Sequence, residues 1–401
     1  MDRRAKPEGG ASSERDDTSR HQRRFSSVAS IAVLLVLAAA AALVYMRISA
    51  PFGSSSSSGS LTRSERLTGG PPAQTTSAPQ TLGSLEVNPR LQVKCTLPIT
   101  VYSRRVRINL PSGLVTLDGA QTLDARTPNA SSYVVGRWLP VPQAWVSPDG
   151  KSYASVTAVP GSPGYQAVVL SDPDTGNSHA LWQGEGQVSL IGWGPDGIYF
   201  VPPATATEQK KSGELWVVSP VGSSAAHRVG PSPGSPASRL SFSSDTRLSG
   251  GAAWDAGQAD GGPYRVQRTD LRDGSVRDWY TAPANTSVFI LTFDGQGRPL
   301  LALFGENESS TRALMVLTGP NQTSPIEIPS GPPVRFATGY LDPHGIWLGS
   351  PGSLWMYQSG SLIKVADVPL GLVGAPTPMP ISNARQSAAS LPPVAVNGDC
   401  A

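Results

Sequence analysis

A recurring unit of about 48 residues constrains this chain more than any other feature of its sequence. Each copy places an aromatic residue shortly before a polar turn, and the turns fall at Gly150, Gly197, Thr246, Gly297 and Gly345, which lie 47, 49, 51 and 48 residues apart. Between these turns, pairs of alternating strands flank a second turn rich in Gly, Pro and Asp. One period therefore contains about four antiparallel strands.

A four-stranded unit buries only one face against each neighbour, and a ring of such units removes most exposed edges. The sequence therefore predicts an all-β fold, a β-propeller over residues 91–401. We expect six blades; the alternative of seven would need roughly 340 residues at this period. The turn-like element at 394–398 begins a blade that it is too short to finish, so we expect the C-terminal strand to complete the blade begun by the strands of 91–140.

The run from Phe25 to Met46 holds 22 residues without a charge, enough for a helix to span a bilayer. Several arginines lie shortly before this run, so the positive-inside rule places 1–24 in the cytoplasm and the rest of the chain outside. This predicts a single-pass, type II signal-anchor in the cell membrane with an extracytoplasmic C-terminal domain. The alternative is a cleaved signal peptide, for which the apolar run is long.

Residues 47–90 are dominated by Ser, Gly, Thr and Pro, and they predict a flexible linker between membrane and propeller. The tail 1–24 is polar and is expected to be disordered. The net charge of +3 is small and is concentrated in that tail, which argues against binding to nucleic acid.

The best copy of the aromatic turn, Trp145-Val-Ser-Pro-Asp-Gly150-Lys151, resembles the WD-like repeat of TolB-type β-propellers. The other copies are degenerate, and the one at Phe242 lacks the glycine. The resemblance covers about 250 residues and concerns the fold. It implies an extracytoplasmic interaction platform.

The two cysteines, Cys95 and Cys400, lie near the two ends of the predicted propeller. In an oxidising compartment they can form a disulfide that closes a loop of about 300 residues. The alternative is a pair of free thiols that never meet.

Most of the chemical motifs have a structural explanation. Ser232 lies in a Gly-x-Ser-x-Gly pattern, but prolines on both sides forbid a nucleophile elbow. Asp172 and Asp174 are spaced as in a calcium loop but lack its later Glu, so a hairpin turn is expected with a weak cation site as the alternative. The sequence thus predicts no cofactor, no metal site and no catalytic residue. The three histidines beyond the predicted membrane segment fall in different blades: His179, His227 and His344.

A basic cluster and the tryptophans complete the inventory. Arg104, Arg105 and Arg107 are expected to protect a solvated edge strand, with contact to an anionic polymer as the alternative. Tryptophans such as Trp145 and Trp193 are expected in the core between sheets rather than in a carbohydrate-binding stripe.

Two functions remain. The first is a membrane-tethered binding or scaffold module at the cell surface, and the second is a propeller enzyme of lyase or glycosidase type with its site at the channel mouth. For a ligand, the innermost strands are the expected lining, and three arginines there would suit a small anionic ligand or an acidic protein loop: Arg137, Arg239 and Arg335. The segments expected to hold those strands are 137–145, 187–193, 237–242, 287–293 and 334–340.

Overall fold

The computed structural model describes residues 80–101, 104–118, 131–203, 214–221, 225–229, 242, 245–258, 261–305, 310–373 and 394–401. All of them belong to one compact unit, Glu65–Ala401. The tail 1–24 and the segment 25–46, where the sequence predicts a transmembrane helix, lie outside these ranges. Within these ranges, no helix is long and apolar enough to cross a membrane.

Antiparallel β-strands build the described part of the chain, together with two short 3-10 helices, η1 (Gln143–Trp145) and η2 (Leu370–Val373). Four sheets have four strands each, in chain order. The first two are β10 (Ser189–Gly194), β11 (Gly197–Val201), β12 (Leu215–Val218), β13 (His227–Val229), and β14 (Arg247–Ser249), β15 (Ala252–Gln258), β16 (Tyr264–Asp270), β17 (Val276–Thr281). The next two are β18 (Thr286–Phe293), β19 (Pro299–Gly305), β20 (Ala313–Gly319), β21 (Gln322–Ile326), and β22 (Thr338–Asp342), β23 (Gly345–Ser350), β24 (Ser353–Gln358), β25 (Ser361–Asp367).

Three further sheets complete the described strands. One has three strands, β7 (Tyr153–Ala158), β8 (Tyr165–Ser171) and β9 (Ser178–Glu185), and one is a hairpin, β5 (Ser132–Val134) and β6 (Arg137–Leu139). The last, which we call the closing sheet, has the order β1 (Gln80–Ser84), β4 (Leu114–Leu117), β3 (Arg104–Leu110), β2 (Cys95–Val101), β26 (Ala395–Val396).

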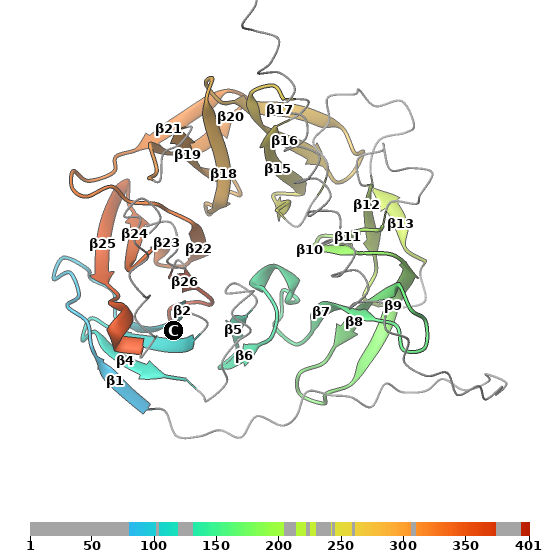
Figure 1. The fold of residues 1–401 in the computed structure, drawn as a ribbon, viewed down its shortest axis with the longest axis horizontal. Coiled ribbons are helices and arrows are strands. Elements are labelled where there is room, and N and C mark those ends of the chain that lie inside the picture. Colours follow the sequence, from blue (N-terminus) through green and yellow to red (C-terminus); the bar gives the residue numbers. More distant parts are fainter. Residues whose placement is uncertain are drawn as a thin grey trace, which may run out of the picture. The chain divides into compact units, whose positions relative to one another are not determined.

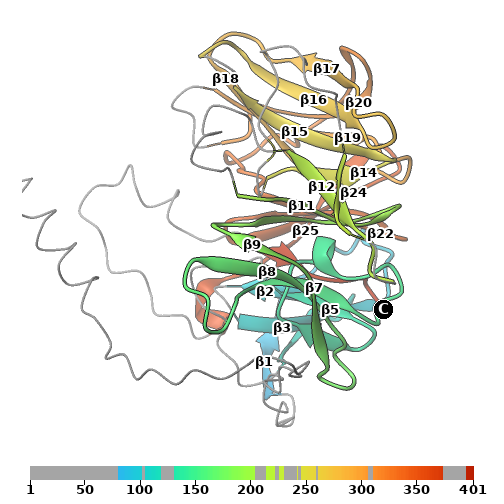
Figure 2. The ribbon, with the colours of Figure 1, turned by 90° about the vertical axis from the view of Figure 1, so that its right-hand side faces the viewer.

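The sheets follow one another around a ring, as Figure 1 shows. Neighbouring sheets contact each other through β7 and β10, β10 and β14, β15 and β18, β18 and β22, and β22 and β26. Figure 2 shows the two neighbouring sheets β14–β17 and β18–β21 together at the top of the view, as in Figure 1. This arrangement is a β-propeller, as the repeat predicts.

The burial of the strands in the sheet β18–β21 explains their amino-acid pattern. Strand β19 is apolar and all of its residues are buried, because it lies second in its sheet with neighbouring sheets against both faces. Strand β21, at the outer edge of the same sheet, exposes all of its residues except Ile326. The tryptophans behave as expected, since Trp145, Trp182 and Trp193 pack against a core shared by the sheets β7–β9 and β10–β13.

The C-terminal strand closes the ring, as the sequence predicts. Strand β26 pairs antiparallel with β2, with Ile99 opposite Val396 and Thr100 opposite Ala395. The first and the last strands of the described propeller are thus joined in one sheet, and a single hydrophobic core runs through the closing sheet and the sheet β22–β25.

The predicted boundary between linker and propeller is wrong. Strand β1 lies inside the range 47–90 expected as linker, and it pairs with β4. The chain then crosses to the neighbouring sheet, where Val87 bridges Ala366 and the Asn88 backbone N–H donates to Val365 O at 2.8 Å. The composition of this segment gave no sign of a strand, yet Leu85, one of its few apolar residues, is buried in the core.

The predicted turn at 245–246 is also wrong. The hairpin between β14 and β15 turns at Gly250 and Gly251, with φ of 59° and 70°. Two consecutive residues with positive φ form the tight turn that suits a two-residue hairpin, and glycine adopts it without strain. The strand before this turn is therefore β14, not the segment 237–242. Similarly, the segment 137–145 holds β6 and η1 in place of one innermost strand.

Strand β3, with Arg104, Arg105 and Arg107, is not an edge strand. It lies between β4 and β2, and Arg105 is only 5% exposed. Its guanidinium lies 5.4 Å from the centre of the Trp138 ring, and burial lowers its pKa. The charge is kept inside because an aromatic face and nearby Asp118 accompany it.

Candidate binding groove

A hollow with a volume of about 1030 Å³ lies beside the sheet β22–β25. One wall is the connection between β21 and β22, one is formed by β24 and β25, and the loop after β1 closes one side. We call it the groove. Its lining includes Asn88, Arg90, Pro332, Arg335, Trp355 and Lys364.

The connecting wall is held at its end by hydrogen bonds. The Thr311 backbone N–H donates to Val334 O at 2.7 Å, and the Thr311 hydroxyl accepts from the Phe336 N–H at 2.9 Å. Between β21 and these anchors, Pro329, Pro332 and Pro333 are exposed and stiffen the chain, because proline fixes φ. The wall is therefore largely formed before any ligand arrives.

The floor of the groove is formed by Trp355 with hydroxyls beside it. Trp355 is 5% exposed and meets Phe336 edge-on, with ring centres 5.7 Å apart. Its indole N–H donates to the Ser353 hydroxyl at 3.0 Å, and that hydroxyl also pairs with Ser350. Each of these polar groups already has a partner, so the floor is rigid.

Two cations of the groove have no carboxylate partner among the residues described. Lys364 pairs with Asp367 at 2.6 Å. In contrast, the guanidinium of Arg335 lies over the Phe304 ring, 5.2 Å from its centre, and Arg90 contributes only a backbone N–H bond to Asn88. The groove therefore carries a net positive charge from two arginines that are able to bind an anion.

The structure describes two of the three arginines that the sequence singled out, and it gives these two different surroundings. Arg335 lines the groove. Arg137 instead forms an ion pair with Asp174, on the turn between β8 and β9. Arg239 lies outside the described residues, as does Ser232.

The acidic turn at Asp172 is a hairpin turn, as expected. The Asp172 carboxylate accepts the backbone N–H groups of Asp174 at 2.7 Å and Thr175 at 3.2 Å. These bonds lower its pKa. One oxygen of this carboxylate thus accepts both hydrogen bonds of the turn.

Sequence reasoning missed Arg90 and Lys364. Arg90 falls in the predicted linker, and Lys364 lies on an outer strand, so nothing in the repeat pointed to either residue. Only the crossing of the chain from β1 to β25 brings them together, and that crossing depends on the Asn88 side chain, whose N–H donates to Lys364 O at 2.9 Å.

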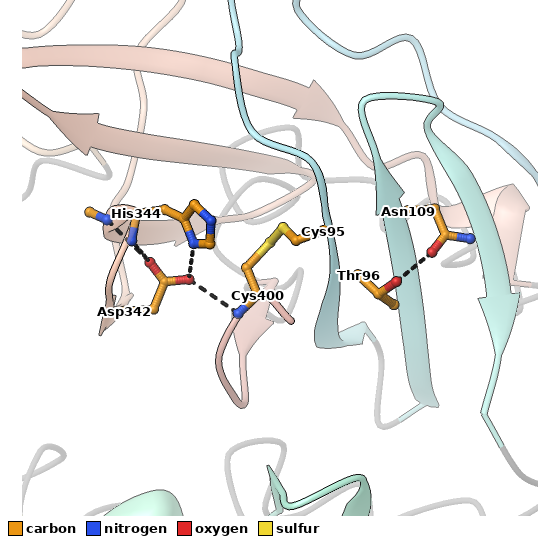
Figure 3. Close-up of a disulfide and its surroundings, with 7 residues drawn as sticks. Cys95, Thr96, Asn109, Asp342, His344 and Cys400 are labelled. Atoms are coloured by element: carbon orange, nitrogen blue, oxygen red, sulfur yellow. Dashed lines mark hydrogen bonds and ion pairs between the residues drawn. A yellow bond between two sulfur atoms is a disulfide. The ribbon is translucent and has the colours of Figure 1, made fainter.

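A second polar cluster lies where the ring closes, shown in Figure 3. Cys95 and Cys400 form a disulfide with their Cα atoms 5.3 Å apart. Asp342 accepts the backbone N–H groups of His344 at 2.8 Å and Cys400 at 3.1 Å. The Asp342 carboxylate thereby ties the β22–β23 turn to the C-terminal segment. The other two histidines, His179 on β9 and His227 on β13, lie in other sheets.

The closed ring of antiparallel sheets defines the class of protein as a β-propeller. No family model matches the chain, and neither does any curated protein. Its fold resembles that of TolB from Acinetobacter baumannii, at 15% identity and a TM-score of 0.36, over 68% of this chain and 64% of TolB.

Two further solved structures are similar. A prolyl endopeptidase is 13% identical with a TM-score of 0.40, and the match covers 72% of this chain and 44% of the peptidase. The β-propeller domain of a trilobed protease from Pyrococcus furiosus is 12% identical with a TM-score of 0.38, over 73% of this chain and 84% of that domain. This chain spans less than two thirds of the endopeptidase and of TolB. These likenesses concern the fold alone, and the propeller assignment depends on the sheets and their closure.

Proposed function

We propose that this protein is a membrane-tethered, extracytoplasmic binding propeller whose groove takes an extended acidic peptide segment of a partner protein. The observation that carries the proposal is the pair of arginines, Arg90 and Arg335, without carboxylate partners in a preformed groove. The charge-free run at 25–46 and the arginines before it support the membrane tether.

The shape of the groove favours a chain segment over a compact small molecule. Its volume of about 1030 Å³ is at the upper end of the range of small-molecule sites. It is bounded by an extended, proline-rich wall and by strand β25, and polar hydroxyls lie along its floor. An extended peptide lying along these walls places its carboxylates within reach of both arginines.

The lining also favours binding over catalysis. Its carboxylate, Asp367, is paired with Lys364, and its hydroxyls at Ser350 and Ser353 hydrogen bond to each other. Such groups hold and orient a partner, whereas acid–base chemistry needs a carboxylate or imidazole free to exchange a proton.

The test measures binding of a fluorescent peptide of alternating Glu and Gly to the purified full-length protein. A peptide of the same length with Gln in place of Glu is the ligand control. We expect Arg90→Gln with Arg335→Gln to weaken binding by about tenfold or more, because charge-assisted hydrogen bonds contribute about 1.5–3 kcal/mol each.

The matched control protein carries Arg272→Gln and Arg277→Gln, two exposed arginines on the turn between β16 and β17 and on β17. This variant loses the same charge and should bind as the parent protein does. Equal loss of binding in both double variants, or equal binding of the Gln peptide, would contradict the proposal.

A further inference from the structure

The cluster at the ring closure gathers four side chains with metal-binding atoms. One atom each from Asp342, His344 and Cys400 lie within 4.8 Å of one another. Cys95 is bonded to Cys400, so its sulfur lies beside this group of three. These residues come from three distant parts of the chain: the start of β2, the β22–β23 turn and the C-terminal segment (Figure 3).

Local structure fixes this gathering independently of the disulfide. The Asp342 carboxylate accepts the N–H groups of His344 and Gly345, at 2.8 and 3.1 Å, which sets the turn that carries the histidine. It also accepts the Cys400 N–H, and its oxygen lies 3.4 Å from His344 Nδ1. The Asp342 side chain is fully buried, while that of His344 is 33% exposed. A small ion from solvent therefore has access on the histidine side.

We propose that, when its disulfide is reduced, this cluster binds one zinc ion through Cys95, Cys400, His344 and Asp342. Zinc prefers four ligands in a tetrahedron, with thiolate sulfurs at about 2.3 Å and imidazole nitrogens at about 2.0 Å. At those bond lengths, neighbouring ligand atoms lie roughly 3–4 Å apart, and the atoms of Asp342, His344 and Cys400 already lie within 4.8 Å of one another. Two thiolates and an imidazole also match the borderline-soft character of zinc.

The chemistry proceeds in two balanced steps. A small dithiol reduces the protein disulfide to two thiols by thiol–disulfide exchange, and the dithiol itself becomes a cyclic disulfide. Zinc then binds both sulfurs as thiolates, and their two protons pass to solvent. The oxidised protein has no thiolate to offer, so it lacks this site.

The consequence is a ring closure with two chemical forms. In the oxidised form a covalent bond joins the start of β2 to the C-terminal segment. In the reduced form the metal ion joins the same two residues and adds the β22–β23 turn. Loss of the disulfide therefore does not open the ring as long as zinc is present.

The experiment uses the full-length protein, reduced with dithiothreitol and freed of the reductant without oxygen. Cobalt(II) is added as a spectroscopic substitute for zinc, and zinc is then used to displace it. We expect one ion per chain, with thiolate-to-cobalt charge-transfer absorption and tetrahedral d–d bands. The oxidised protein should show neither signal.

The decisive variant is His344→Ala. The His344 ring contacts only Asp342 among the interactions described, so the oxidised variant should fold with an unchanged circular dichroism spectrum. After reduction, its zinc affinity should fall by about tenfold or more, since even outer-shell partners contribute that much. His179→Ala, on another sheet, is the matched control and should bind zinc as the parent protein does.

Equal metal affinity in the parent protein and the His344→Ala variant would overturn the proposal, because it would mean that two thiols alone bind the ion. Absence of the charge-transfer band in the reduced parent protein would also overturn it. If reduction unfolds the protein, recovery of the native circular dichroism on adding zinc is the supporting result. Failure to recover it would count against the site.

Discussion

Replacing Asn397 with Ala should destabilise the protein more than any other single polar substitution at the ring closure. Asn397 is buried, and its side chain links the C-terminal segment both to β2 and to Ser131, just before β5. Its amide oxygen accepts the Thr100 hydroxyl on β2, and its amide nitrogen donates to Ser131 O at 2.7 Å. Its backbone also pairs with Pro98 O and the Tyr133 N–H.

The size of the effect follows from the groups left behind. Alanine keeps the backbone bonds but leaves the Thr100 hydroxyl, 1% exposed, and the Ser131 carbonyl without their partner. A buried polar group without a partner costs about 1–3 kcal/mol, so the two together should lower the free energy of unfolding by about 2–6 kcal/mol. Most of this loss of stability comes from the buried Thr100 hydroxyl and Ser131 carbonyl, which are left without a partner, rather than from the removal of the amide itself.

The assay is urea unfolding of the full-length protein and of a double-mutant cycle with Thr100→Val. Asn397→Ala leaves the Thr100 hydroxyl without a partner, and Thr100→Val removes that hydroxyl. The double variant should therefore lose less free energy of unfolding than the sum of the two single variants. A loss below about 0.5 kcal/mol for Asn397→Ala, the level of ordinary surface changes, would refute the reasoning. Additive losses would show that the two side chains do not interact.

Three other predictions concern packing, pH and topology. A methyl group at Gly349 would lie 1.6 Å from Val394 O, so Gly349→Ala should lower stability by about 1–3 kcal/mol, whereas Gly295→Ala, with open space around it, should not; thermal unfolding of both variants checks this. Backbone hydrogen bonds lower the pKa of Asp172 below its usual value. The ionised carboxylate therefore contributes its full stability above that usual value, and this contribution is lost as the pH falls through the lowered pKa. Asp172→Ala should therefore be less stable than the parent protein at pH 7 and equal to it in strong acid, and a constant difference across pH would contradict this. Protease added to intact cells should remove the propeller and spare a tag at the N-terminus if segment 25–46 is an uncleaved anchor; digestion of that tag would contradict the proposed topology.

The repeat made the fold predictable from sequence, because each blade repeats the same requirement for turns and buried strands. The aromatic turns near Gly197, Gly297 and Gly345 all lie at the start of the strand that follows, as expected. The copy at Phe242 failed, because the glycines that form the tight turn occur a few residues later, at Gly250 and Gly251.

The groove was not predictable, because its residues lie far apart in the sequence and belong to no repeat. Arg335 was singled out for its charge, and it does line a cavity, but its neighbours there are Arg90 and Lys364 rather than Arg137. Arg137 has Asp174 as its partner, on a turn from the next sheet. The sequence shows which segments carry a charge, whereas the partner of each charged side chain depends on which turns lie close together in the folded protein.

The central claim is that the chain closes into a ring through its C-terminal segment, and disulfide mapping tests it most directly. Protein isolated under alkylating conditions is digested without reduction, and the linked peptides are identified by mass spectrometry. The account predicts one linked pair that joins Cys95 to Cys400, across 305 residues. Recovery of both cysteines as alkylated, separate peptides would contradict the closure.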